Sequence, residues 1–77
     1  MNEDMTVWEV FGKAQCPVEI WGWDVETGCS FMMRRFEQKE VSLGDFRDDP
    51  VFQTYAEQYI VKLTVKNERL QVWVSEV

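Results

Sequence analysis

The chain has 77 residues, with 14 acidic against 8 basic side chains, a net charge of −6, no histidine and two cysteines. This length accommodates one domain, residues 1–77, and the 45% hydrophobic content is that of a folded chain rather than a disordered one. No run of about 18 apolar residues is present to cross a membrane, and the acidic start Met-Asn-Glu-Asp-Met is unlike a secretory signal. We therefore expect a globular cytoplasmic protein whose Cys16 and Cys29 are reduced thiols.

The first half of the chain predicts three strands. Residues 5–11 favour a strand, followed by a loop at residues 12–16. Residues 17–36 favour a hairpin whose three-residue loop, 26–28, ends on Gly28 in the left-handed conformation. That loop sets four cross-strand pairs: Val25 with Cys29, Trp23 with Phe31, Trp21 with Met33, and Glu19 with Arg35.

One short helix is predicted between the hairpins, near residues 50–58. Asp48 or Asp49 is suited to cap it, and Pro50 fits the first helical position, where an N–H has no intrahelical partner. Apolar residues recur at a spacing of four from residue 51 to residue 60, which gives the helix one apolar stripe.

The C-terminal segment predicts a second hairpin with a two-residue turn at residues 67–68. Apolar and polar residues alternate on both sides of this turn. The register then pairs Lys66 with Arg69, Val65 with Leu70, Leu63 with Val72, and Val61 with Val74. The chain as a whole is thus expected to be an α+β domain: an antiparallel sheet of about five strands with one helix against it.

The residue types argue against an enzyme. A catalytic thiol usually has a histidine beside it, and two cysteines without histidine do not complete a zinc site within one chain. We expect Cys29 to be buried in the sheet and Cys16 to lie in a loop. The acidic cluster at residues 45–49 lacks the spacing of a calcium loop, so helix capping is its favoured explanation. No catalytic residue, metal site or cofactor site is therefore assigned.

The large apolar side chains exceed what one helix can cover. Trp21 and Trp23 share one face of their strand while Val18 and Ile20 share the other, and Trp73 lies opposite its apolar neighbours in the last strand. Either residues 1–16 and 37–49 wrap over the second face, or a partner covers it. The sequence leaves open which face the helix occupies. Exposed tryptophans of this kind favour an interaction surface.

The predicted function is that of a small acidic protein that occupies the surface of a partner protein. By analogy of class, small phage and mobile-element inhibitors of host nucleic-acid-binding or defence proteins have this character. Residues 1–33 carry a net charge of −5, so a basic partner surface is expected. The chain lacks the basic clusters needed for direct nucleic-acid binding. The candidate contact residues are Trp8, Trp21, Trp23 and Trp73 as anchors and Glu3, Asp4, Glu9, Asp24 and Glu26 as an acidic rim. The alternative is an assembly subunit that forms a homodimer through its sheet face.

Overall fold

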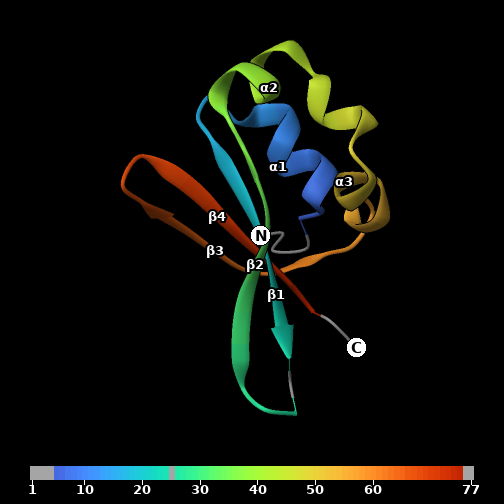
Figure 1. Ribbon diagram of the computed structural model, residues 1–77, viewed down its shortest axis with the longest axis vertical. Helices are drawn as coiled ribbons and strands as arrows, with labels where there is room; N and C mark the ends of the chain where they lie inside the picture. The colour runs from blue at the N-terminus through green and yellow to red at the C-terminus, as the bar shows by residue number, and fades with distance from the viewer. Residues whose placement is uncertain (1–4, 25, 76–77) are drawn as a thin grey trace.

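The computed structural model describes residues 5–24 and 26–75. Its elements in chain order are α1 (Val7–Lys13), β1 (Val18–Asp24), β2 (Cys29–Phe36), α2 (Gln38–Leu43), the 3-10 helix η1 (Asp45–Asp48), α3 (Pro50–Tyr55), β3 (Ile60–Lys66) and β4 (Arg69–Ser75). The strands form one sheet in the order β2-β1-β4-β3. Figure 1 shows the helices gathered together, with the β1–β2 and β3–β4 hairpins extending away from them.

The α+β class is confirmed, but the predicted sheet of about five antiparallel strands is wrong in two respects. The described residues contain a four-stranded sheet, and its two central strands, β1 and β4, are parallel. The outer pairs, β1–β2 and β3–β4, are the two predicted antiparallel hairpins. Parallel pairing brings together the most apolar segments, because Val18, Ile20, Val72 and Val74 are all fully buried.

The strand predicted at residues 5–11 is instead helix α1. Thr6 caps this helix: its hydroxyl accepts a hydrogen bond from the Glu9 backbone N–H at 3.2 Å, and the Glu9 carboxylate accepts one from the Thr6 N–H at 2.9 Å. Val7, Val10 and Phe11 are buried, which is the spacing of one helical face. The capping box and this spacing outweigh the strand propensity of the segment.

The core lies between the sheet and a layer formed by all the described helices. Phe11 of α1 packs against Phe36, Phe46 and Phe52, with ring centroids 5.1, 4.8 and 4.9 Å away. Val41 of α2 belongs to the same buried cluster. Residues 37–49 therefore cover the same face as α1 and α3 and do not wrap over the second face.

The β3–β4 hairpin has the predicted turn and three of its four predicted pairs. Lys66 pairs with Arg69, Val65 with Leu70 and Leu63 with Val72. The predicted pair of Val61 with Val74 is wrong, because the register shifts between residues 60 and 62 and Ile60 takes that place.

In the β1–β2 hairpin the pair of Glu19 with Arg35 is confirmed, and Gly28 has the expected positive φ of 74°. The register shifts between Ile20 and Trp21, so that Trp21 pairs with Met32 and Trp23 with Ser30. The predicted pairs of Trp21 with Met33 and Trp23 with Phe31 are therefore wrong. Cys29 pairs with Asp24, while Val25, its predicted partner, lies outside the described residues.

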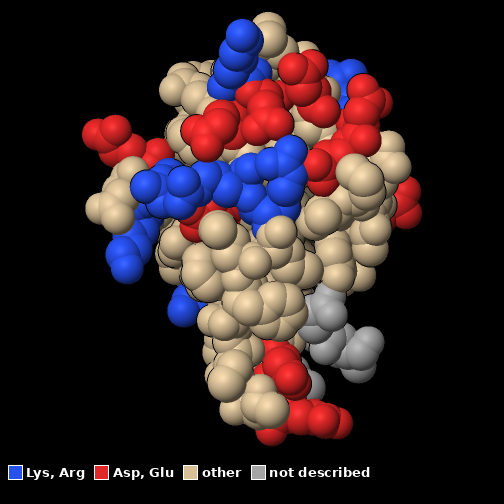
Figure 2. Space-filling view, viewed as in Figure 1, with Lys and Arg blue, Asp and Glu red and all other residues tan. Residues whose placement is uncertain are grey.

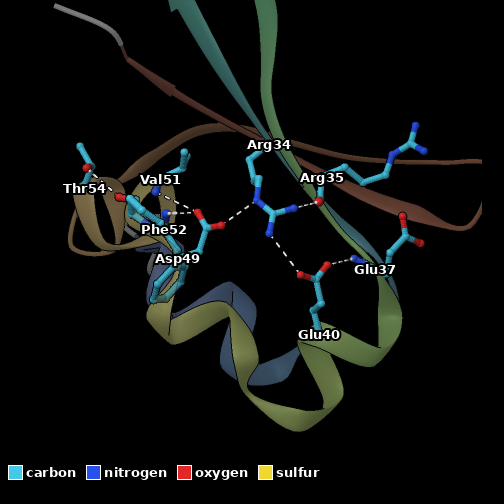
Figure 3. A network of polar contacts seen from close by, with 9 residues as sticks. Arg34, Arg35, Glu37, Glu40, Asp49, Val51, Phe52 and Thr54 are labelled. Atoms are coloured by element: carbon cyan, nitrogen blue, oxygen red, sulfur yellow. Dashed lines mark hydrogen bonds and ion pairs between the residues drawn. The ribbon is translucent and has the colours of Figure 1, made fainter.

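Arg34 lies opposite Ile20, before the register shift, on the face of the sheet that the helices cover. There its Nε donates to Asp49 at 2.7 Å and its Nη2 donates to Glu40 at 3.1 Å (Figure 3). Asp49 also accepts hydrogen bonds from the backbone N–H groups of Val51 and Phe52, at 2.9 and 3.3 Å. One arginine of β2 thus holds both α2 and the beginning of α3.

The helix predicted near residues 50–58 is confirmed as α3, which ends earlier, at Tyr55. Asp49 is its cap and Pro50 its first residue, as expected. The helix α2 and the 3-10 helix η1 were not predicted. Their signals are weak, because each has at most six residues and one buried side chain.

The turn of the β3–β4 hairpin generates a stability prediction. Asn67 and Glu68 both have positive φ, 54° and 63°, a conformation that suits glycine better than glutamate. We expect Glu68→Gly to raise the free energy of unfolding by about 1 kcal/mol, measured by urea denaturation. Glu68→Ala is the control, since it removes the same charge and keeps the Cβ atom. An equal gain in both variants would contradict the backbone explanation.

Candidate functional site

The face of the sheet opposite the helices carries a continuous set of polar and aromatic side chains, here called the open face. Alternation along the strands and their register define its members. They are Ser30, Met32 and Arg35 of β2, Glu19, Trp21 and Trp23 of β1, Arg69, Gln71 and Trp73 of β4, and Lys62, Thr64 and Lys66 of β3.

Glu19 is the buried centre of the open face, with only 1% of its surface exposed. One carboxylate oxygen accepts hydrogen bonds from Trp21 Nε1 and Gln71 Nε2, both at 3.0 Å. The other accepts from Arg35 Nε at 3.2 Å and from Arg69 Nη1 at 3.1 Å. Donors from three strands therefore converge on one carboxylate.

These contacts keep Glu19 ionised. Burial by itself raises the pKa of the carboxyl group, but the hydrogen bonds from Trp21, Gln71, Arg69 and Arg35 outweigh burial and hold the pKa below its ordinary value. The negative charge is consequently present in the folded protein at neutral pH and is matched by the two guanidinium groups.

Beside Glu19, the aromatic side chains form a stack that runs across the strands. The rings of Trp21 and Trp73 are stacked, with centroids 5.3 Å apart and an angle of 25° between their planes. The Lys62 ammonium lies 4.9 Å from the centroid of the Trp73 ring. Trp73 is 8% exposed, and its Nε1 has no hydrogen-bond partner among the described residues. Met32, which pairs with Trp21, remains exposed.

The open face is basic although the chain as a whole is acidic. It contains Arg35, Lys62, Lys66 and Arg69, half of the eight basic residues of the chain, against the single carboxylate of Glu19, so its net charge is +3. Within the described part of the chain, Lys62 and Lys66 form no ion pair. Figure 2 shows a band of basic residues across the middle of the molecule, between acidic groups above and a largely uncharged area below.

The structure separates the predicted contact residues. Trp21, Trp23 and Trp73 are together on the open face, but Trp8 lies on α1, with 51% of its surface exposed. The predicted acidic rim does not surround the tryptophans. Glu9 belongs to the cap of α1, Asp24 and Glu26 lie at the end of the β1–β2 hairpin, and Glu3 and Asp4 are outside the described residues.

Trp8 borders a separate hollow of about 630 Å³ between α1 and α3. Its ring packs on Phe52 at 5.7 Å between centroids. Arg47, Gln53 and Glu57 also line the hollow, which therefore mixes charges of both signs.

The two cysteines lie at separate places in the fold. Both are free thiols; Cys16 is part-buried and Cys29 is exposed, so the predicted burial of Cys29 is wrong. Its place at the first position of β2, opposite Asp24, keeps it at the solvated end of the hairpin. No group of three or more metal-ligating side chains is found in residues 5–24 and 26–75.

Several residues of the open face were missed by the sequence analysis: Arg35, Lys62, Lys66, Arg69 and Gln71. The predicted pair of Glu19 with Arg35 was an available signal for the first of these. Arg69 and Gln71 contact Glu19 because β1 pairs in parallel with β4. No pattern among residues close in sequence predicts that pairing.

Comparison with protein-family models, curated proteins and solved structures finds no match to this chain. Among the described helices, none has the length and apolar character needed to cross a membrane.

The convergence on Glu19 predicts a pH-dependent contribution to stability. Glu19→Gln removes the charge that matches Arg35 and Arg69, and we expect it to lower the free energy of unfolding by about 2 kcal/mol at pH 7. Because the pKa of Glu19 is depressed in the folded state, this contribution is fully present above the unfolded-state pKa and is lost as the pH falls through the folded-state pKa. The difference between wild type and variant should therefore shrink on acidification.

Urea denaturation at a series of pH values measures this difference. Glu26→Gln, at the exposed end of the β1–β2 hairpin, makes the same chemical change outside the open face and is the matched control. A loss of stability that is equal for both variants, or independent of pH, would contradict the assigned role of Glu19.

Proposed function

We propose that this protein is a non-enzymatic binding protein that occupies the surface of a partner protein through its open face. The observation that carries the proposal is the combination of four cations with a tryptophan stack on the sheet face that the described helices leave uncovered. Trp, Met and Arg are the residue types enriched at protein interfaces. The hydrogen bonds to Glu19 fix Trp21, Arg35 and Arg69 in advance, which lowers the entropic cost of binding.

The charge of the open face favours a partner with an acidic surface. Lys62 and Lys66 have no described anionic partner. Acidic groups of another protein would therefore supply the opposite charges for these two lysines. The sequence-based expectation of a basic partner came from the net charge of −5 in residues 1–33. The described acidic residues of that segment do not surround the tryptophans, since Glu9 caps α1 and Asp24 and Glu26 lie at the end of the β1–β2 hairpin.

The geometry of the tryptophans favours a protein over a single-stranded nucleic acid. Base stacking requires an accessible ring face. One face of the Trp73 ring is covered by Trp21, and Lys62 lies over the ring as well. The Trp73 ring therefore leaves little free face on which a base could stack.

The same charges argue against a homodimer in which two open faces meet, because the cations of the two copies would repel each other. We propose instead that the protein blocks a surface of a foreign partner by steric occupation, as an inhibitor does. The binding would take place in the cytoplasm, where the free thiols Cys16 and Cys29 stay reduced.

A pair of matched charge reversals tests this proposal. The variant Lys62→Glu/Lys66→Glu changes the open face, whereas Lys13→Glu/Lys39→Glu makes the same change on α1 and α2. Each protein is immobilised and used to capture proteins from a lysate of its host. Affinities for the captured protein are then measured with purified components by calorimetry at two salt concentrations.

We expect the open-face variant to lose at least tenfold in affinity and the control variant to bind like the wild type. Binding of the wild type should weaken as salt increases, because the contacts are charged. Equal losses in both variants, or tight binding of a thymidine oligonucleotide by the wild type, would contradict the proposal.

A further inference from the structure

Strand β3, at one edge of the sheet, carries three exposed apolar side chains. Val61, Leu63 and Val65 have 57%, 44% and 70% of their surface exposed. β3 is the last strand in the sheet order, and β4 is its neighbour on one side only. The unpaired N–H and C=O groups of an edge strand are a template for pairing with another strand, and lysines such as Lys62 and Lys66 limit the registers in which β3 can pair.

The backbone of β3 presents free hydrogen-bonding groups at these same residues. In a two-residue hairpin the pair that closes the turn, here Lys66 with Arg69, is hydrogen-bonded, and such pairs alternate with non-bonded ones. Leu63 and Val65 are therefore non-bonded positions whose N–H and C=O groups point away from β4. At the start of the strand, the outward N–H of Ile60 already donates to the Met5 carbonyl at 2.9 Å. The free edge thus begins after Ile60.

From this edge we propose that a second copy of the chain pairs antiparallel with β3, about a two-fold axis at Leu63. Leu63 then lies opposite Leu63 of the second copy, and Val65 lies opposite Val61 of the second copy, the residue at which β3 shifts its register against β4. Every cross-strand pair on the helix-bearing side is apolar. On the open-face side, Lys62 lies opposite Thr64 of the second copy, so no two cations face each other directly.

Charge selects this register over its neighbour. A two-fold axis at Thr64 would place Lys62 opposite Lys66 of the second copy, twice in one interface, and directly opposed like charges destabilise a sheet. Both axes align the outward backbone groups of the two strands, so the charges alone decide between the two registers. Because the interface is isologous, it closes at two copies and does not propagate into a filament.

The dimer extends what each chain presents to a partner. Pairing at the two β3 edges joins two four-stranded sheets into one of eight strands, with both open faces on the same side. The two sets of cations and tryptophan stacks would then form one continuous surface. The dimer does not depend on the identity of any partner, so its test is separate from that of the proposed function.

Disulfide cross-linking tests both the contact and the register. In a background with Cys16→Ser and Cys29→Ser, the variant Leu63→Cys should form a covalent dimer under mild oxidation, because hydrogen-bonded antiparallel pairs have Cα atoms about 5.5 Å apart, within disulfide range. Thr64→Cys and Val65→Cys should give little dimer, since neither residue faces its own copy. Predominant cross-linking through Thr64→Cys would overturn the proposed register.

Light scattering after size-exclusion chromatography tests the dimer without a cross-link. The mass of the wild type should double as the concentration rises from micromolar to millimolar. Val65→Lys, at a highly exposed position that tolerates the change, should stay monomeric, whereas Leu43→Lys on α2, also exposed, should still dimerise. A wild type that stays monomeric throughout, or that forms open filaments, would overturn the proposal. So would a monomer whose β3 edge amides are protected from hydrogen exchange, because the edge would then be occupied within one chain.

Discussion

The open face of this protein depends on one buried carboxylate. A charge as fully buried as that of Glu19 is strongly destabilising unless it is matched and hydrogen-bonded. Arg35 on one neighbouring strand and Arg69 on the other match the charge of Glu19. Gln71, on the same strand as Arg69, donates a further hydrogen bond to the carboxylate. Glu19 therefore connects β1 to both of its neighbours, β2 in the antiparallel hairpin and β4 in the parallel pair. Its hydrogen bonds hold two arginines on the uncovered side of the sheet.

The sign of the net charge does not describe the open face. The chain carries −6, yet the open face carries +3, because the acidic residues lie mainly on the helix side and at the end of the β1–β2 hairpin. At physiological ionic strength, interactions between exposed charges are largely screened beyond about 8 Å. A partner in contact with the sheet therefore responds to the local cations more than to the total charge.

Strand β3 serves two surfaces through the alternation of its side chains. Lys62 and Lys66 extend the basic open face, and Lys62 covers the Trp73 ring. Leu63 and Val65 point to the side of the helices, yet they lie beyond the helix layer and remain exposed. One strand thus carries the unpaired cations of the proposed partner surface and the unpaired edge of the proposed dimer.

Features that depend on residues close in sequence could be predicted. The turn at Asn67 and Glu68, the cap of α3 by Asp49 and the pair of Glu19 with Arg35 each rest on a local contact or a hairpin register. The capping box of α1 is equally local, and its signal was outweighed by the apolar, β-prone composition of residues 5–11.

The parallel contact of β1 with β4 was decided only by tertiary structure, as was the register shift after Ile20 that places Met32 opposite Trp21 and Ser30 opposite Trp23. The parallel contact depends on which apolar strands are buried together, and β1 and β4 are too far apart in the sequence for a local pattern to predict it. The sequence by itself determined a small, acidic, histidine-free domain with two hairpins. The fold alone decided where its charges lie, because pairing strands distant in sequence gathers half of the cations on one face around a single carboxylate.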